Sequence, residues 1–211
     1  MEGSVDRDAI VLAIPRGGVI VGYEVAHQLK IQLDLIIPRK IGAPDNPELA
    51  IGAIAEDGAV IIDSDLVKYL EVSKSYISEE SQRQLAEIRR RLRLYRGDTP
   101  YPNLRDREVI IVDDGIATGS TMNAAVTSTR VKGAKTVIIA VPVCPGSGVS
   151  ELKKEADRVI CLHSPEPFYA IGQFYGDFDQ INDQEVIDLL NQSRTELNPD
   201  KHSNQQTETG A

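Results

Sequence analysis

The sequence predicts an α/β fold built on a mainly parallel sheet flanked by helices. Short apolar runs rich in Val and Ile alternate along the chain with segments of helical periodicity. Strands of a parallel sheet have this composition because helices cover both of their faces. The length of 211 residues suits one well-cored α/β domain. We therefore expect a single domain over residues 1–191 and a polar, disordered tail over residues 192–211.

The predicted elements follow from these runs in chain order. Buried strands are expected at residues 9–14, 33–38, 109–112, 136–141 and 158–162. Helices are expected at residues 19–29, 64–96, 122–131 and 149–156. Between the second strand and the second helix, residues 42–47 (GAPDNP) predict a mobile loop. Residues 50–55 and 59–63 flank Asp57-Gly58 and predict a β-hairpin.

The stretch VIIVDDGIATGST at residues 109–121 carries the clearest chemistry. Its apolar strand ends in Asp113 and Asp114, and a turn of small residues then opens a helix. Backbone N–H groups and the dipole at a helix start favour a bound anion, and Gly119 permits close approach of the chain to it. Hydroxyl donors in the turn are Thr118, Ser120 and Thr121. The turn therefore predicts a phosphate site.

The two carboxylates indicate which chemical groups accompany the phosphate in the ligand. Because carboxylates repel phosphate, Asp113 and Asp114 are expected to accept hydrogen bonds from sugar hydroxyls or to hold a cation. A ribose 5′-phosphate meets both requirements. The stretch has neither the GxxxxGK[ST] pattern of nucleoside-triphosphate loops nor the glycine order of a dinucleotide fingerprint.

Basic residues follow two other predicted strands. Arg16-Gly17-Gly18 comes after the first strand and can grip a diphosphate through its guanidinium and backbone N–H groups, although a plain turn is the alternative. Arg39 and Lys40 follow the second strand, where paired cations suit a polyphosphate, although a solvated pair is the alternative. Ligands of parallel sheets bind at the carboxyl ends of the strands, so these groups are expected at one edge with the acidic pair.

Several other features are weighed against simpler explanations. The arginines at positions 89–96 favour a solvated helix face paired with acids, with direct substrate contact as the alternative. The aromatic residues between 168 and 178 either pack the end of the domain or stack on a flat heterocycle. His163 lacks the partners of a metal site, and no GxSxG nucleophile motif is present.

The composition disfavours binding to nucleic acid, insertion into a membrane and secretion. The net charge of -9 disfavours attraction to nucleic acid or anionic membranes, and no apolar run approaches the ~20 residues of a membrane span. The first residues lack the layout of a secretory signal, and Cys144 and Cys161 lack CxxC spacing. Buried structural thiols and a cytoplasmic location are therefore expected.

Three segments in order, PRGG, RKIGAPDNPELAIGAIAEDG and VIIVDDGIATGST, resemble the type I phosphoribosyltransferase family. The likeness is greatest to a branch of small prokaryotic members and runs from about Ala9 to Leu190, with AVPVCP and LHSPEPFYAIGQFYGDF also similar. The resemblance implies a parallel sheet flanked by helices with a small hood over the site. It also implies a homodimer that transfers a phosphoribosyl group from phosphoribosyl diphosphate to a nitrogenous base, with magnesium.

The resemblance also assigns roles by position. Asp113 and Asp114 would hold the ribose hydroxyls, and the 5′-phosphate would be wrapped by Ala117, Thr118, Gly119, Ser120 and Thr121. The diphosphate loop would be Arg16, Gly17 and Gly18, with Arg39 and Lys40 stabilising the departing diphosphate as catalytic residues. Magnesium would be held mainly by substrate oxygens and water, near the acidic pair.

Two departures from the family pattern bear on the acceptor. Members acting on 6-oxopurines carry an Asp where this chain has Ala117, so hypoxanthine and guanine are disfavoured, whereas adenine, orotate and uracil types tolerate Ala. The branch also has more chain before the first strand than the residues preceding Ala9 here, which predicts that part of the hood or its support is absent. The acceptor base itself is not predicted.

Two other functions remain open from the sequence. The same fold can serve as a module that senses phosphoribosyl diphosphate without catalysis and regulates a gene or a partner protein. A hydrolase of phosphorylated sugars using Asp113 or Asp114 is weaker, because no activating base or metal cluster accompanies them.

Overall fold

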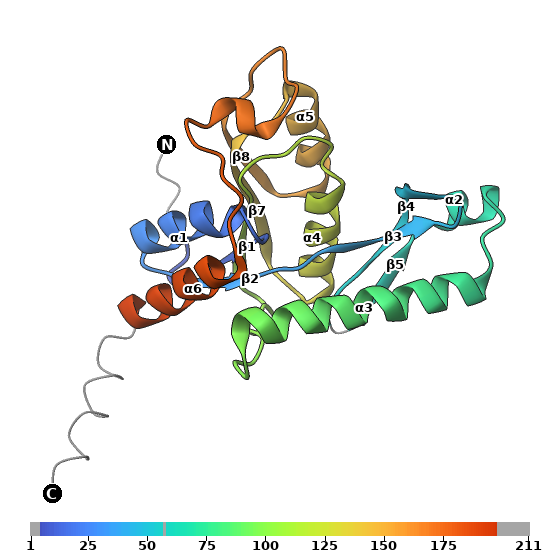
Figure 1. The fold of residues 1–211 in the computed structure, drawn as a ribbon, viewed down its shortest axis with the longest axis horizontal. Coiled ribbons are helices and arrows are strands. Elements are labelled where there is room, and N and C mark those ends of the chain that lie inside the picture. Colours follow the sequence, from blue (N-terminus) through green and yellow to red (C-terminus); the bar gives the residue numbers. More distant parts are fainter. Residues whose placement is uncertain (1–4, 57, 198–211) are drawn as a thin grey trace, which may run out of the picture.

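A five-stranded parallel sheet forms the centre of the molecule (Figure 1). The computed structural model describes residues 5–56 and 58–197. The strands lie in the order β2-β1-β6-β7-β8, and every neighbouring pair is parallel. They are β1 (Ile10–Ala13), β2 (Gln32–Leu35), β6 (Glu108–Val112), β7 (Thr136–Val143) and β8 (Arg158–His163). The predicted α/β fold class is confirmed.

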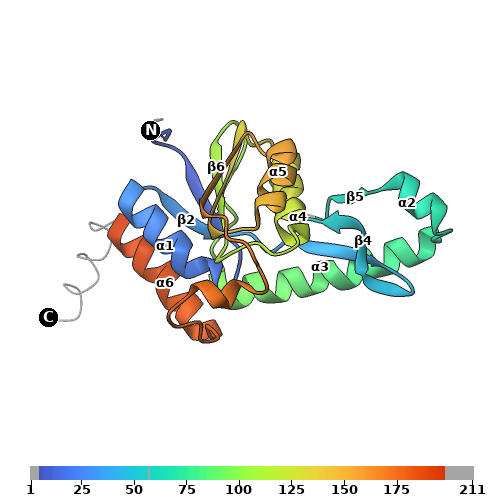
Figure 2. The same ribbon diagram turned by 90° about the horizontal axis from the view of Figure 1, so that it is seen from above.

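Helices cover both faces of this sheet (Figures 1 and 2). On one side lie α1 (Gly18–Leu29) and α6 (Asp183–Leu197). On the other lie α4 (Ser120–Val131) and α5 (Gly146–Glu155). Each layer of helices encloses its own hydrophobic cluster against the sheet.

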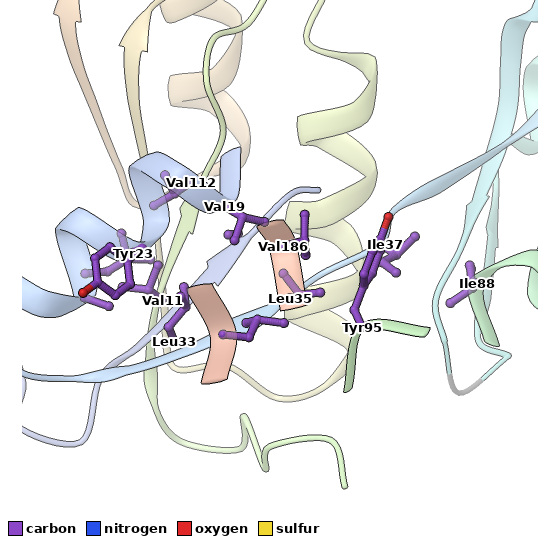
Figure 3. Packing of buried hydrophobic residues seen from close by; sticks show 14 of the residues in the cluster. Val11, Val19, Tyr23, Leu33, Leu35, Ile37, Ile88, Tyr95, Val112 and Val186 are labelled. Carbon is purple, nitrogen blue, oxygen red and sulfur yellow. The ribbon is translucent and has the colours of Figure 1, made fainter. Parts of the chain in front are cut away.

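The alternation of side chains along β1 supplies both clusters. Val11 and Ala13 belong to the cluster beneath α1 and α6, whereas Ile10 and Leu12 belong to the one beneath α4. Figure 3 shows Val11 in the first cluster with Val19 of α1 and Val186 of α6. Because both faces of β1 are buried, its sequence is apolar throughout, as the parallel sheet requires.

A second, antiparallel sheet projects to one side of the first (Figure 1). It comprises β3 (Arg39–Ala43), β4 (Asn46–Ile54) and β5 (Val60–Ile62). The hairpin expected around residues 50–63 is confirmed as β4 and β5. The expected mobile loop at residues 42–47 was wrong, because Gly42 and Ala43 pair with β4 and only Pro44 and Asp45 separate the strands. The turn formers there close a tight hairpin.

The long predicted helix at residues 64–96 is two helices. α2 (Ser64–Tyr69) and α3 (Lys74–Arg96) are separated by a turn in which Glu71 has a φ of +53°. Ser73 caps α3, since its hydroxyl accepts a hydrogen bond from the backbone N–H of Tyr76 at 3.2 Å. α3 then runs beneath the second sheet and back to the first (Figure 2).

The polar tail was predicted to begin at residue 192, which is too early. Residues 192–197 continue α6, and the rest of the tail lies outside the described residues. Glu196 explains this extension, because its carboxylate lies 2.8 Å from the hydroxyl of Tyr23 and 2.9 Å from Nδ1 of His27 on α1. A polar residue at the start of the predicted tail therefore holds α6 against α1.

The segment between β8 and α6 crosses above the parallel sheet (Figure 1). This covering segment, residues 164–182, includes the short 3₁₀ helix η1 (Ile171–Phe174). Among the described residues, no helix combines the length and apolar character that a membrane crossing requires.

Candidate functional site

The loop after β1 lies directly against the acidic pair that follows β6. A Cβ placed on Gly17 would lie 1.8 Å from Oδ2 of Asp114, and one on Gly18 would lie 2.8 Å from the Cα of Asp113. Only glycine allows this approach. The structure thus brings together the Arg16-Gly17-Gly18 loop and the two carboxylates, as predicted from their positions at strand ends.

The acidic pair is held in a partly buried setting. Oδ1 of Asp113 accepts a hydrogen bond from the backbone N–H of Asp114 at 2.9 Å, and the hydroxyl of Tyr175 donates to the carbonyl oxygen of Asp114. Burial, and then the charge of Asp114, raise the pKa of Asp113 to about 8, and burial also raises the pKa of Asp114. Two adjacent negative charges are therefore unfavourable here until hydrogen-bond donors or a cation satisfy them.

The turn at residues 117–121 is open toward solvent, with Ala117 and Thr118 exposed. Gly119 has a φ of +79°, and the first intrahelical hydrogen bond of α4 runs from the N–H of Asn123 to its carbonyl at 2.9 Å. Within the described part of the chain, no backbone or side-chain acceptor pairs with the N–H groups of residues 117–121. A cavity of about 200 Å³ is lined by Ala117, Thr118, Gly119 and Thr121 of this turn and by Ile171 of the covering segment. The turn can therefore receive an anion.

A larger cavity of about 650 Å³ is lined by Asp114, which also lines the smaller one. Arg16, Gly17 and Asp114 form one part of its wall, and Tyr175 and Phe178 of the covering segment form another. The rings of Tyr175 and Phe178 lie 5.0 Å apart.

The aromatic residues of the covering segment divide between the two expected roles. Phe174 packs against Phe168 at 5.2 Å and against His163 at 5.9 Å, which is end-of-domain packing. Tyr175 and Phe178 instead line the larger cavity. Sequence reasoning missed the contact of Tyr175 with Asp114, because no local pattern links residues this far apart in the chain.

Arg39 and Lys40 do not line either cavity. Both belong to β3. Lys40 Nζ lies 2.8 Å from the carboxylate of Glu48 on β4. Burial, and then the charge of Arg91 on α3, lower the pKa of Arg39. Their predicted catalytic role remains a prediction.

A family model described as phosphoribosyl transferase domain matches residues 4–179. The chain belongs to this family.

Known phosphoribosyl transferase relatives extend beyond the part that this chain matches. Two proteins of Mycobacterium tuberculosis, from strains CDC 1551 and H37Rv, are named "Putative phosphoribosyl transferase MT0597" and "Putative phosphoribosyl transferase Rv0571c". Each is 41% identical to this chain over 191 residues, which is 90% of the chain but 43% of the relative. The chain thus spans less than half the length of these curated relatives.

A solved structure supports the same fold. The crystal structure of TT1426 from Thermus thermophilus has 38% identity and a TM-score of 0.80, with 88% of each chain covered. Together with the family match, this similarity confirms the phosphoribosyl transferase fold expected from the sequence.

The donor set at the site of this phosphoribosyl transferase domain suits magnesium shared with a substrate. Nowhere in residues 5–56 or 58–197 do three or more His, Cys, Asp or Glu side chains gather into a metal site. Asp113 and Asp114 offer two adjacent carboxylates, and Mg²⁺ is commonly held by one or two carboxylates together with phosphate oxygens and water. The residues present therefore fit a cation that arrives with its ligand.

Proposed function

We propose that this domain binds phosphoribosyl diphosphate and transfers its 5-phosphoribosyl group to a nitrogenous base, releasing diphosphate. The observation that carries the proposal is the open row of N–H groups at residues 117–121 beside the Asp113–Asp114 pair. Membership of the phosphoribosyl transferase domain family supports the same reaction.

The two sides of the turn match the two ends of a ribose phosphate. The N–H groups and the dipole at the start of α4 hold the 5′-phosphate, and Ser120 adds a hydroxyl donor. Asp113 and Asp114 accept hydrogen bonds from the ribose hydroxyls, which satisfies carboxylates whose pKa values burial has raised. The Arg16-Gly17-Gly18 loop, which touches Asp114, faces the diphosphate.

In the proposed reaction the bond from ribose C1 to the diphosphate oxygen breaks and a bond to the base nitrogen forms. The electron pair of the broken bond leaves with the diphosphate, and the base loses its proton to solvent. Positive charge develops on the ribose ring, so catalysis comes from placement of the reactants and from charge stabilisation of the departing group. Arg16 supplies this charge at the site. Magnesium, held by Asp113, Asp114, substrate oxygens and water, would add charge neutralisation.

A non-catalytic sensor of phosphoribosyl diphosphate is the second candidate. It is favoured by the position of Arg39 and Lys40, which line neither cavity although the family resemblance gives them the catalytic charges. It is also compatible with relatives that extend well beyond the matched region, where a partner domain could respond to the ligand.

A diphosphate-release assay with a panel of bases separates the two candidates. The chain is incubated with phosphoribosyl diphosphate, magnesium and adenine, uracil, orotate, hypoxanthine or guanine, with the Asp113→Asn/Asp114→Asn double variant as the matched blank. Base-dependent release that the double variant lacks supports the transferase, and Ala117 predicts that the 6-oxopurines are poor acceptors. Tight binding without release with any base supports the sensor, and absence of both binding and release refutes the proposal.

A further inference from the structure

The two carboxylates of the site stand on a short stretch of backbone that the parallel sheet does not hold. The pairing of β6 with β1 ends where the carbonyl oxygen of Val112 accepts a hydrogen bond from the N–H of Ile14 at 2.9 Å. The next backbone hydrogen bond runs from the N–H of Ile116 to the carbonyl oxygen of Val143 at 3.0 Å. Residues 113–115 lie between these two bonds and belong to no strand or helix. The direction of their carboxylates therefore depends on other contacts.

One hydrogen bond reaches this stretch from a distant part of the chain. The hydroxyl of Tyr175, 61 residues farther on, donates to the carbonyl oxygen of Asp114. The hydrogen bond from the N–H of Asp114 to Oδ1 of Asp113 is local to the stretch. Within residues 5–56 and 58–197, no second group from outside residues 113–115 donates a hydrogen bond to it. The hydroxyl of Tyr175 is therefore the external contact that can set the orientation of the Asp114 peptide.

The ring of Tyr175 is itself held in place by packing. The ring of Phe178 lies against it, with the two centroids 5.0 Å apart. A Cβ on Gly172 would lie 2.7 Å from Cδ1 of Phe178, so the backbone of η1 comes directly against the second ring. The hydroxyl of Tyr175 therefore belongs to a packed unit of the covering segment.

The covering segment also meets the site on either side of Tyr175. A Cβ on Gly115 would lie 2.7 Å from Cγ2 of Ile171, so the segment packs directly on the backbone that carries the acidic pair. Just after the segment, Oδ1 of Asp183 on α6 lies 3.9 Å from Nη1 of Arg16 in the loop after β1. These contacts fix the place of Tyr175 relative to the site.

We propose that Tyr175 is a positioning residue of the ribose site, whose hydroxyl orients the Asp114 peptide so that the carboxylates of Asp113 and Asp114 face the ribose hydroxyls. This inference rests on the proposed function, which gives the two carboxylates that role. Hydrogen bonds weaken steeply as donor and acceptor lose alignment, so rotation of this peptide would weaken the contacts with the sugar. Binding groups generally need such support from the residues behind them to keep a productive geometry.

The expected defect is confined to recognition of a sugar hydroxyl. Ribose 5-phosphate and 2-deoxyribose 5-phosphate share the phosphate assigned to the turn at residues 117–121, and they differ in the 2-hydroxyl assigned to the acidic pair. The ratio of their affinities therefore reports the placement of the carboxylates and not the strength of phosphate binding. A hydrogen bond to a charged acceptor predicts that the wild type prefers ribose 5-phosphate by about tenfold or more.

Calorimetric titration of both sugar phosphates into the full chain tests this proposal. Tyr175→Phe removes the hydroxyl and keeps the ring that packs on Phe178. In this variant the preference for ribose 5-phosphate is expected to fall to about twofold or less, with affinity for the deoxy sugar within about twofold of the wild type. Tyr169→Phe is the matched control, because Tyr169 lies in the same segment with 83% of it exposed, and it should keep the wild-type preference.

The outcomes separate this inference from the proposed function. A wild-type preference for ribose 5-phosphate that persists in Tyr175→Phe would overturn the positioning role and leave the proposed function standing. An equal loss of affinity for both sugars would also overturn it, because such a loss indicates general damage to the site. A wild-type chain that binds the two sugars equally well, or binds neither, would refute the proposed function and this inference together.

Discussion

At the scale of single residues, the site depends on the absence of a side chain at position 17. Alanine there would place its Cβ 1.8 Å from Oδ2 of Asp114. We predict that Gly17→Ala displaces that carboxylate and weakens phosphoribosyl diphosphate binding by more than about tenfold, an effect of at least ~1.4 kcal/mol. Calorimetry checks the affinity, and circular dichroism checks that the fold is retained.

Gly146→Ala provides the control for this substitution. A Cβ on Gly146 would meet nothing within 4 Å, so binding should be unchanged. Equal affinities for the Gly17 and Gly146 variants would contradict the account of the loop.

The residues that sequence could identify are those whose role is local. Asp113, Asp114 and the turn after them form one continuous motif, and Arg16 follows a strand in the same way. Tyr175 and Asp183 could not be identified, because their contacts with the site join distant parts of the chain. Such contacts depend on packing rather than on spacing.

At the scale of elements, a buried ion pair attaches the end of α3 to the parallel sheet. Nε of Arg96 lies 2.6 Å from Oδ1 of Asp34 on β2, and the two side chains are 4% and 3% exposed. Removing one partner leaves an uncompensated buried charge, so Arg96→Ala should lower the free energy of unfolding by about 3–5 kcal/mol. Urea denaturation measures the change.

The neighbouring Arg93→Ala substitution tests whether the effect belongs to the buried pair. Arg93 is exposed on the same turn of α3, and its loss should change the free energy of unfolding by less than about 0.5 kcal/mol. A similar, small loss for both variants would show that the Arg96–Asp34 pair does not anchor the helix.

The elements that sequence predicted well are those with continuous periodicity. The strands of the parallel sheet and α1 lie within a few residues of expectation. The division of residues 64–96 into two helices was missed, because apolar spacing continues across the turn near Glu71. Residues 192–197 were assigned to a tail because they are polar, yet Glu196 uses its polarity to bind α1.

At the scale of the whole molecule, sheet topology decides which functional residues meet. β1 and β6 are neighbours, so the groups after them reach one edge together. Arg39 was expected at that edge, but the chain continues into the antiparallel sheet beside α3 instead. Sequence periodicity predicts strands without their order, and this difference could not be foreseen. A homodimer remains a prediction.

The most direct test of the central claim is calorimetric titration of phosphoribosyl diphosphate with magnesium into the wild-type chain and into Asp113→Asn/Asp114→Asn. The exposed Asp98→Asn serves as a control for the loss of a surface carboxylate. We predict saturable binding by the wild type and the control, and none by the double variant. Unchanged affinity in the double variant would contradict the assignment of the acidic pair and its turn as the ribose phosphate site.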